Sequence, residues 1–197
     1  MYNGCVAVAS THPARAGRRT PPILFGTVLF LASEVLFFGG LFGAYFALRA
    51  STALWPPEGV ELETVLATVG TVILVVSSFT FQAGVRAGER GRLGGLRAWS
   101  LVTLVLGATF LGIQWWDWSH LDFGVSSHAY GTMFFTMTGF HGLHVAGGLV
   151  LMLVILGRLA QGAYRDGNLT GPQAVAYYWH FVDVVWVALY ATLFLLR

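Results

Sequence analysis

Five uninterrupted apolar stretches constrain the fold of this chain more than any other feature of its sequence. A helix needs about 20 apolar residues to cross the hydrocarbon core of a membrane, and all five stretches are long enough. The segments between them carry the Pro, Gly and charged residues that are typical of turns. We therefore predict an all-α membrane protein, a bundle of five transmembrane helices. The predicted spans are residues 23–48, 62–85, 96–116, 130–156 and 175–196.

The composition excludes a soluble globule of this size. Of the 197 residues, 56% are hydrophobic and only 10% are charged, whereas about 25% of the residues of a soluble domain are charged. We assign residues 23–197 to one transmembrane domain and residues 1–22 to a polar N-terminal tail. The net charge of +2 gives no reason to expect a nucleic acid as a partner. With Cys5 as its only cysteine, the chain forms no internal disulfide and no centre built on several thiolates.

The distribution of arginine predicts the orientation of the bundle, because the cytoplasmic segments of membrane proteins are enriched in basic residues. If the N-terminus lies inside, the inner segments hold nine of the 11 basic residues, and the outer segments hold only Arg49 and Arg197. Residues 1–22 also lack the apolar core and cleavage site of a signal peptide. We therefore expect a cytoplasmic N-terminal tail and a C-terminus on the outside.

One acidic residue, Glu34, lies in the middle of the first span between apolar neighbours. A charged side chain at that depth is costly, so an ionisable residue in a span is a candidate for function. Two roles stay open for Glu34. It is either a carboxyl that exchanges protons or a protonated carboxyl that forms a structural hydrogen bond with a neighbouring helix.

Two pairs of polar residues occur in the last two spans. His141 and His144 are three residues apart, as are His180 and Asp183, so each pair shares a helix face. With Glu34, these four side chains offer a possible metal site. The Glu-x-x-His motifs of di-iron bundles are missing, however. We therefore expect no metal, and favour a buried polar network that ties the first, fourth and fifth spans together.

Other polar and small residues of the spans carry weaker predictions. At the end of the third span, Gln114 can join the polar network, whereas we expect Asp117 to face the outer water. The Gly39–Gly43 and Gly142–Ala146 spacings allow close helix approach. We favour packing within the chain for both, with contact to another subunit as the alternative. No nucleophile constellation or phosphate loop is present, so we predict no catalytic residue.

Several segments, in chain order, carry the motifs of a known family. They are residues 33–40 (SEVLFFGG), 114–118 (QWWDW), 130–135 (YGTMFF), 138–148 (TGFHGLHVAGG) and 177–186 (YYWHFVDVVW). Together they resemble subunit III of the haem-copper oxidases over residues 23–197. That family often has seven helices, and this chain is similar to its five-helix bacterial form, which lacks the first two.

The resemblance implies a subunit without redox centres in a proton-pumping terminal oxidase of the bacterial plasma membrane, a cytochrome c oxidase of the aa3 type. Its partners would be subunit I, which holds haem and copper, subunit II and membrane phospholipids. A larger respiratory supercomplex stays open. The implied role is to stabilise subunit I, to sustain proton uptake and to hold lipids.

The resemblance also implies roles for individual residues. Glu34 takes the position of the family's carbodiimide-reactive carboxyl. The polar residues of the last two spans match positions with structural or lipid-proximal roles: His141, His144, His180 and Asp183. On electrostatic grounds alone, we expect lipid headgroups to bind Arg86, Arg90 and Arg97.

Three alternatives remain from the sequence. The first is the same subunit in a quinol oxidase. That enzyme differs from a cytochrome c oxidase in its electron donor, and the presence or absence of a copper site in subunit II would distinguish the two. A subunit III-like partner of a nitric oxide reductase would have a genome neighbourhood without oxidase subunits. A stand-alone proton-coupled transporter would use Glu34 as its proton site and would purify without a haem protein.

Overall fold

The computed structural model of the chain describes residues 21–196 and confirms an all-α protein with five long helices. All five are long and apolar enough to cross a membrane. The helices are α1 (Pro22–Ser51), α2 (Thr64–Glu89), α3 (Leu93–Ser119), α4 (Ala129–Ala160) and α5 (Thr170–Tyr190), and a π-helical segment, η1 (Ala191–Leu195), continues α5. The predicted N-terminal tail lies almost wholly outside the described residues.

The helices extend past several of the predicted apolar spans because their polar ends stay helical. The α2 helix, for example, runs on to Glu89 through Arg86 and Gly88. Gly91, with a φ of 74°, then forms the turn to α3 in a backbone conformation that glycine adopts readily. Hydropathy locates the membrane core of a helix, and the interfacial turns at its ends add residues that the apolar pattern does not count.

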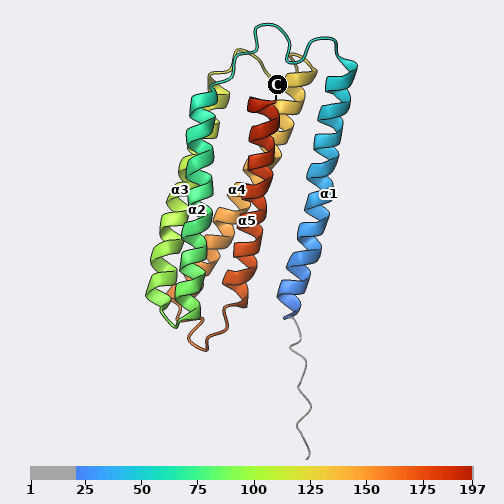
Figure 1. Cartoon of the computed structure of the whole chain (residues 1–197). Helices are drawn as coiled ribbons and strands as arrows, with labels where there is room; N and C mark the ends of the chain where they lie inside the picture. The colour runs from blue at the N-terminus through green and yellow to red at the C-terminus, as the bar shows by residue number, and fades with distance from the viewer. Residues whose placement is uncertain (1–20, 197) are drawn as a thin grey trace, which may run out of the picture.

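Each helix runs antiparallel to the next along the chain, so α1 begins at one end of the bundle and α5 reaches the other (Figure 1). We call these the α1-start end, at the bottom of Figure 1, and the opposite end. The α2 and α3 helices form a closely packed pair at one side, and α5 contacts α1, α2 and α4. The α1 helix lies at the far side, where it packs on α4 and α5.

Small residues let α2 and α3 approach closely. A Cβ atom at Gly95 would lie 2.8 Å from the Cβ of Ala87, and one at Gly84 would lie 3.0 Å from the Cβ of Trp99. The hydroxyls of Thr80 and Thr103 also share a 2.8 Å hydrogen bond across this interface. Contacts of small and hydroxylated residues of this kind are the usual means by which helices associate in lipid.

The side chain of Trp179 on α5 lies at the centre of the bundle. It is fully buried, and its indole N–H donates a 2.9 Å hydrogen bond to the Ser77 hydroxyl on α2. The ring lies against Gly107 of α3 and Gly148 of α4, where added Cβ atoms would lie 2.8 and 2.6 Å from it. One side chain therefore contacts α2, α3 and α4, and a side chain at either glycine would overlap the indole ring.

Candidate functional site

The structure brings two of the predicted polar residues together at the contact between α1 and α4. The Glu34 Oε2 and His144 Nε2 atoms lie 2.9 Å apart, and each side chain is 17% exposed. Glu34 is twelve residues beyond the start of α1, which places it about 18 Å along the helix. The pair therefore lies well inside the apolar part of the bundle.

The other ring nitrogen of His144, Nδ1, shows how many protons the Glu34–His144 pair carries. Its Nδ1 atom lies 2.7 Å from the Phe140 carbonyl oxygen, which can only accept, so Nδ1 carries a hydrogen. A single further proton then lies between His144 Nε2 and Glu34 Oε2. Whichever atom holds that proton, the pair has no net charge, which is how a carboxyl group is accommodated in lipid.

Tyr178 connects this pair to α5. Its hydroxyl donates a 2.8 Å hydrogen bond to the His144 carbonyl oxygen, and its ring stacks on Phe30 of α1 at 6.2 Å. The predicted link between α1, α4 and α5 is therefore present around His144. It is made by a tyrosine that the sequence did not single out.

The other three predicted residues lie elsewhere, so the five do not form one network. His141 is fully buried on the α3 side of α4, with its ring 5.7 Å from Phe110 and 4.8 Å from Trp186. Neither ring nitrogen of His141 has a hydrogen-bond partner within residues 21–196. Residues three apart on a helix differ by about 60° in direction, and here that is enough to give His141 and His144 different neighbours.

His180 and Asp183 share one side of α5 as predicted, but they face α2 rather than α1 or α4. His180 Nε2 donates a 3.0 Å hydrogen bond to the Gln82 side-chain oxygen, and its Nδ1 atom binds the Ser78 hydroxyl. The Asp183 carboxyl lies beside the same hydroxyl. A second polar group therefore occupies the α2–α5 contact, on the other side of α5 from Glu34.

A series of hydrogen bonds runs along the whole α2–α5 contact. The hydrogen bonds each join a residue of α5 to one or two residues of α2: Gln173 to Glu89, His180 to Gln82 and Ser78, Trp179 to Ser77, Trp186 to Thr71, and Tyr190 to Thr68. The α2 partners were not predicted. Their signal in the sequence is a set of Ser, Thr and Gln residues spaced along an otherwise apolar span.

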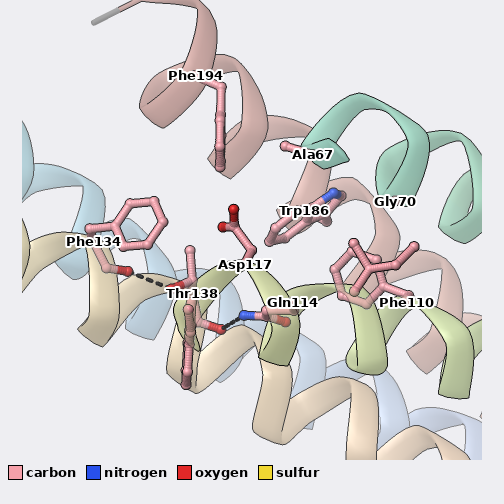
Figure 2. A pocket seen from close by; sticks show the side chains of 11 residues that line it. Ala67, Gly70, Phe110, Gln114, Asp117, Phe134, Thr138, Trp186 and Phe194 are labelled. Carbon is pink, nitrogen blue, oxygen red and sulfur yellow. Dashed lines mark hydrogen bonds between the residues drawn. The ribbon is translucent and has the colours of Figure 1, made fainter. Parts of the chain in front are cut away.

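A small cavity lies among α2, α3, α4 and α5, and the carboxyl group of Asp117 points into it (Figure 2). Its volume is about 20 Å³, enough for about one water molecule. Gln114 donates a 2.7 Å hydrogen bond to the Thr138 carbonyl oxygen and so links α3 to α4. Asp117 is only 9% exposed, so the prediction that it faces outer water is wrong. Ala67 of α2 and Phe194 of η1 line the same cavity and cover the Asp117 carboxyl group.

The two small-residue spacings have different outcomes. A Cβ atom at Gly142 would lie 3.3 Å from the Gln114 oxygen, so this glycine packs within the chain as predicted. At Gly39 and Gly43, an added Cβ would meet nothing within 4 Å. Packing within the chain was therefore the wrong prediction for these two glycines, because they lie on a face of α1 away from α4 and α5.

The three arginines proposed as lipid partners are exposed at the α1-start end of the bundle. Arg86 and Arg90 lie at the end of α2, and Arg97 lies in the first turns of α3. Arg158 lies at the same end, over the ring of Tyr164 at 5.5 Å.

No group of three His, Cys, Asp or Glu side chains among the described residues is placed to hold a metal ion. The chemistry that these residues offer is the sharing of protons and hydrogen bonds inside the membrane.

Comparison with known proteins places the chain in one family. The family model for cytochrome c oxidase subunit III matches residues 8–196. The "Probable cytochrome c oxidase subunit 3" proteins of Nocardia farcinica and Mycobacterium leprae are 43% and 40% identical, each over 98% of both chains. The "Cytochrome c oxidase subunit 3" of Thermostichus vulcanus is 41% identical over 88% of this chain and 87% of its own length.

Proposed function

Because this chain belongs to the cytochrome c oxidase subunit III family, we propose that it stabilises subunit I and sustains proton uptake in a proton-pumping oxidase of the aa3 type. It is a non-catalytic subunit of the cytochrome c oxidase complex and a multi-pass protein of the bacterial plasma membrane. The observation that carries the proposal is the family match over residues 8–196. In the proposed role, haem and copper belong to the partner subunits, and subunits I and II are the direct partners.

The proposed orientation places the N-terminus in the cytoplasm and the C-terminus outside, with residues 23–197 as one transmembrane domain. The arginines among the described residues support this orientation. Arg49 lies at the opposite end of the bundle. All the others lie at the α1-start end: Arg86, Arg90, Arg92, Arg97, Arg158 and Arg165. Cytoplasmic ends carry such an excess. In this orientation Arg86, Arg90 and Arg97 reach the inner leaflet, where each attracts the phosphate of a bound phospholipid.

The proposed part in proton uptake rests on Glu34 and His144. Their 2.9 Å contact holds one proton that either group can carry without a change in the net charge of the pair. The pair is partly exposed at the edge of the bundle, so a neighbouring subunit can reach it. His141, His180 and Asp183 serve in this proposal as structural contacts between helices.

Affinity purification of the tagged chain in a mild detergent tests the proposal. We expect haem to copurify, with the absorption spectrum of an oxidase. Copurification of haem with subunits I and II would support the assigned partners. A colourless preparation of the chain alone would overturn the proposal and favour a stand-alone membrane protein.

A further inference from the structure

The loop between α3 and α4, residues 120–128, folds back onto the first turn of α4 at the end of the bundle opposite the α1-start end. We call it the α3–α4 loop. The Thr132 hydroxyl on α4 donates a 2.7 Å hydrogen bond to the Val125 carbonyl oxygen of the loop. A Cβ atom at Gly131 would lie only 2.6 Å from the Gly124 carbonyl oxygen, so the loop backbone lies directly against the helix. The loop and the first turn of α4 therefore form one packed unit.

His128, the last residue of the α3–α4 loop, joins the two parts of this unit through its ring. Its Nδ1 atom accepts a 2.8 Å hydrogen bond from the Gly131 backbone N–H, which makes His128 the N-cap of α4. A backbone N–H can only donate, so Nδ1 carries no hydrogen, and the neutral ring has its one hydrogen on Nε2. The ring also packs against Phe123 of the loop, with 5.2 Å between the ring centroids. The hydrogen bond to Gly131 therefore requires the neutral form of His128.

Protonation of His128 removes this cap. The imidazolium ion has a hydrogen on both ring nitrogens, so Nδ1 would face the Gly131 N–H as a second donor. The added charge would also lie at the positive end of the α4 dipole, where a cation is unfavourable. Histidine is the side chain that ordinarily changes its charge between about pH 5 and pH 8. The cap is therefore present at the upper end of this range and is lost as the pH falls.

No acidic side chain within residues 21–196 forms an ion pair with His128 and so offsets this effect. The titratable group that faces its ring from α4 is Tyr130, with ring centroids 6.2 Å apart, and the Tyr130 hydroxyl donates to the Leu193 carbonyl oxygen. The α3–α4 loop itself adds Asp122, which is exposed, and His120, whose ring bonds a carbonyl oxygen of α3. His128 is partly exposed, so protons from the surrounding water can reach it.

We propose that the α3–α4 loop is a pH-sensitive cover on this end of the bundle, closed by neutral His128 and released when His128 is protonated. The Phe123 ring of the loop packs on Phe134 of α4 at 5.8 Å, and Phe134 lines the cavity into which Asp117 points. Release of the loop therefore loosens the cover over the α3–α4 contact. The inference rests on the proposed function only for the side of the membrane, because the proposed orientation places this loop outside, where a proton-pumping oxidase releases protons.

Hydrogen–deuterium exchange in the intact oxidase, followed by mass spectrometry of the peptide that contains Gly131, tests this proposal. Each exchange rate is divided by the rate of an unstructured peptide at the same pH, which isolates the protection given by the structure. In the unaltered chain, we expect this protection to fall about tenfold between about pH 8 and pH 5. His128→Asn should keep its protection at both pH values, because asparagine caps a helix and does not titrate. His128→Ala should be weakly protected at both.

His120→Asn is the matched control, because His120 lies in the same loop but bonds α3. It should keep the pH dependence of the unaltered chain. An unaltered chain with equal protection at both pH values would overturn the proposal, as would an equal fall in His128→Asn or the loss of the fall in His120→Asn. The asparagine variant keeps a cap, so it remains decisive if His128→Ala fails to fold. Copurified haem in the same samples would show that the proposed function holds whatever the exchange shows.

Discussion

Gly148→Ala is expected to destabilise the bundle, because the new methyl group would enter the space of Trp179. The added Cβ would lie 2.6 Å from two carbon atoms of the indole ring, and carbon atoms prefer a separation of about 3.5–4.0 Å. The ring must therefore move by about 1 Å. It is held by Gly107 on α3 and by its hydrogen bond to Ser77 on α2.

Overpacking of this kind costs about 1–3 kcal/mol, and we expect the upper part of that range because the ring has no free side. The gain in helix propensity from Gly to Ala offsets about 1 kcal/mol of it, which leaves a net loss of about 1–2 kcal/mol. Gly157→Ala is the matched control on the same helix, since its Cβ would meet nothing within 4 Å.

To compare the two variants, the purified complex is heated in detergent, and the fraction of this subunit that stays bound is measured at each temperature. We expect the subunit to be lost at a lower temperature in Gly148→Ala than in Gly157→Ala. If the two variants are equally stable, Trp179 is not the tightly packed centre that the geometry describes.

The remaining predictions concern polar contacts. Glu34→Gln should leave the initial rate of oxygen reduction nearly unchanged in the assembled oxidase, because no electron passes through this subunit; an immediate and complete loss of turnover would count against the supporting role. Ser77→Ala removes the acceptor of the Trp179 indole N–H and should cost about 0.6 kcal/mol, the average for such bonds in membranes. Chemical unfolding of the purified complex measures that loss, and an unchanged midpoint would show that the bond adds nothing.

Hydropathy was sufficient to find all five helices, because the cost of exposing backbone to lipid leaves few alternatives to a long apolar helix. The positions of individual side chains were harder to predict. The spacing of His141 and His144 predicts a shared face, but their partners depend on how α4 is rotated against α1, α3 and α5. That rotation depends on packing between helices, such as that of Gly148 against Trp179, which no local pattern encodes.

The errors at Asp117 and Gly39 have the same origin. Asp117 follows two tryptophans at the end of a span, a pattern typical of the membrane surface. In the structure, residues from α2 and η1, distant in sequence, cover its carboxyl group. Gly39 lies in a spacing that favours close packing, but it points away from the other helices of the chain.

The most direct test of the central claim compares the oxidase with and without this subunit. After removal of the chain with detergent, we predict an unchanged haem spectrum and an undiminished initial rate of oxygen reduction, with activity that declines during sustained turnover. Adding the chain back should slow that decline. Loss of haem, or an immediate loss of oxygen reduction when the chain is removed, would contradict a supporting, non-catalytic role.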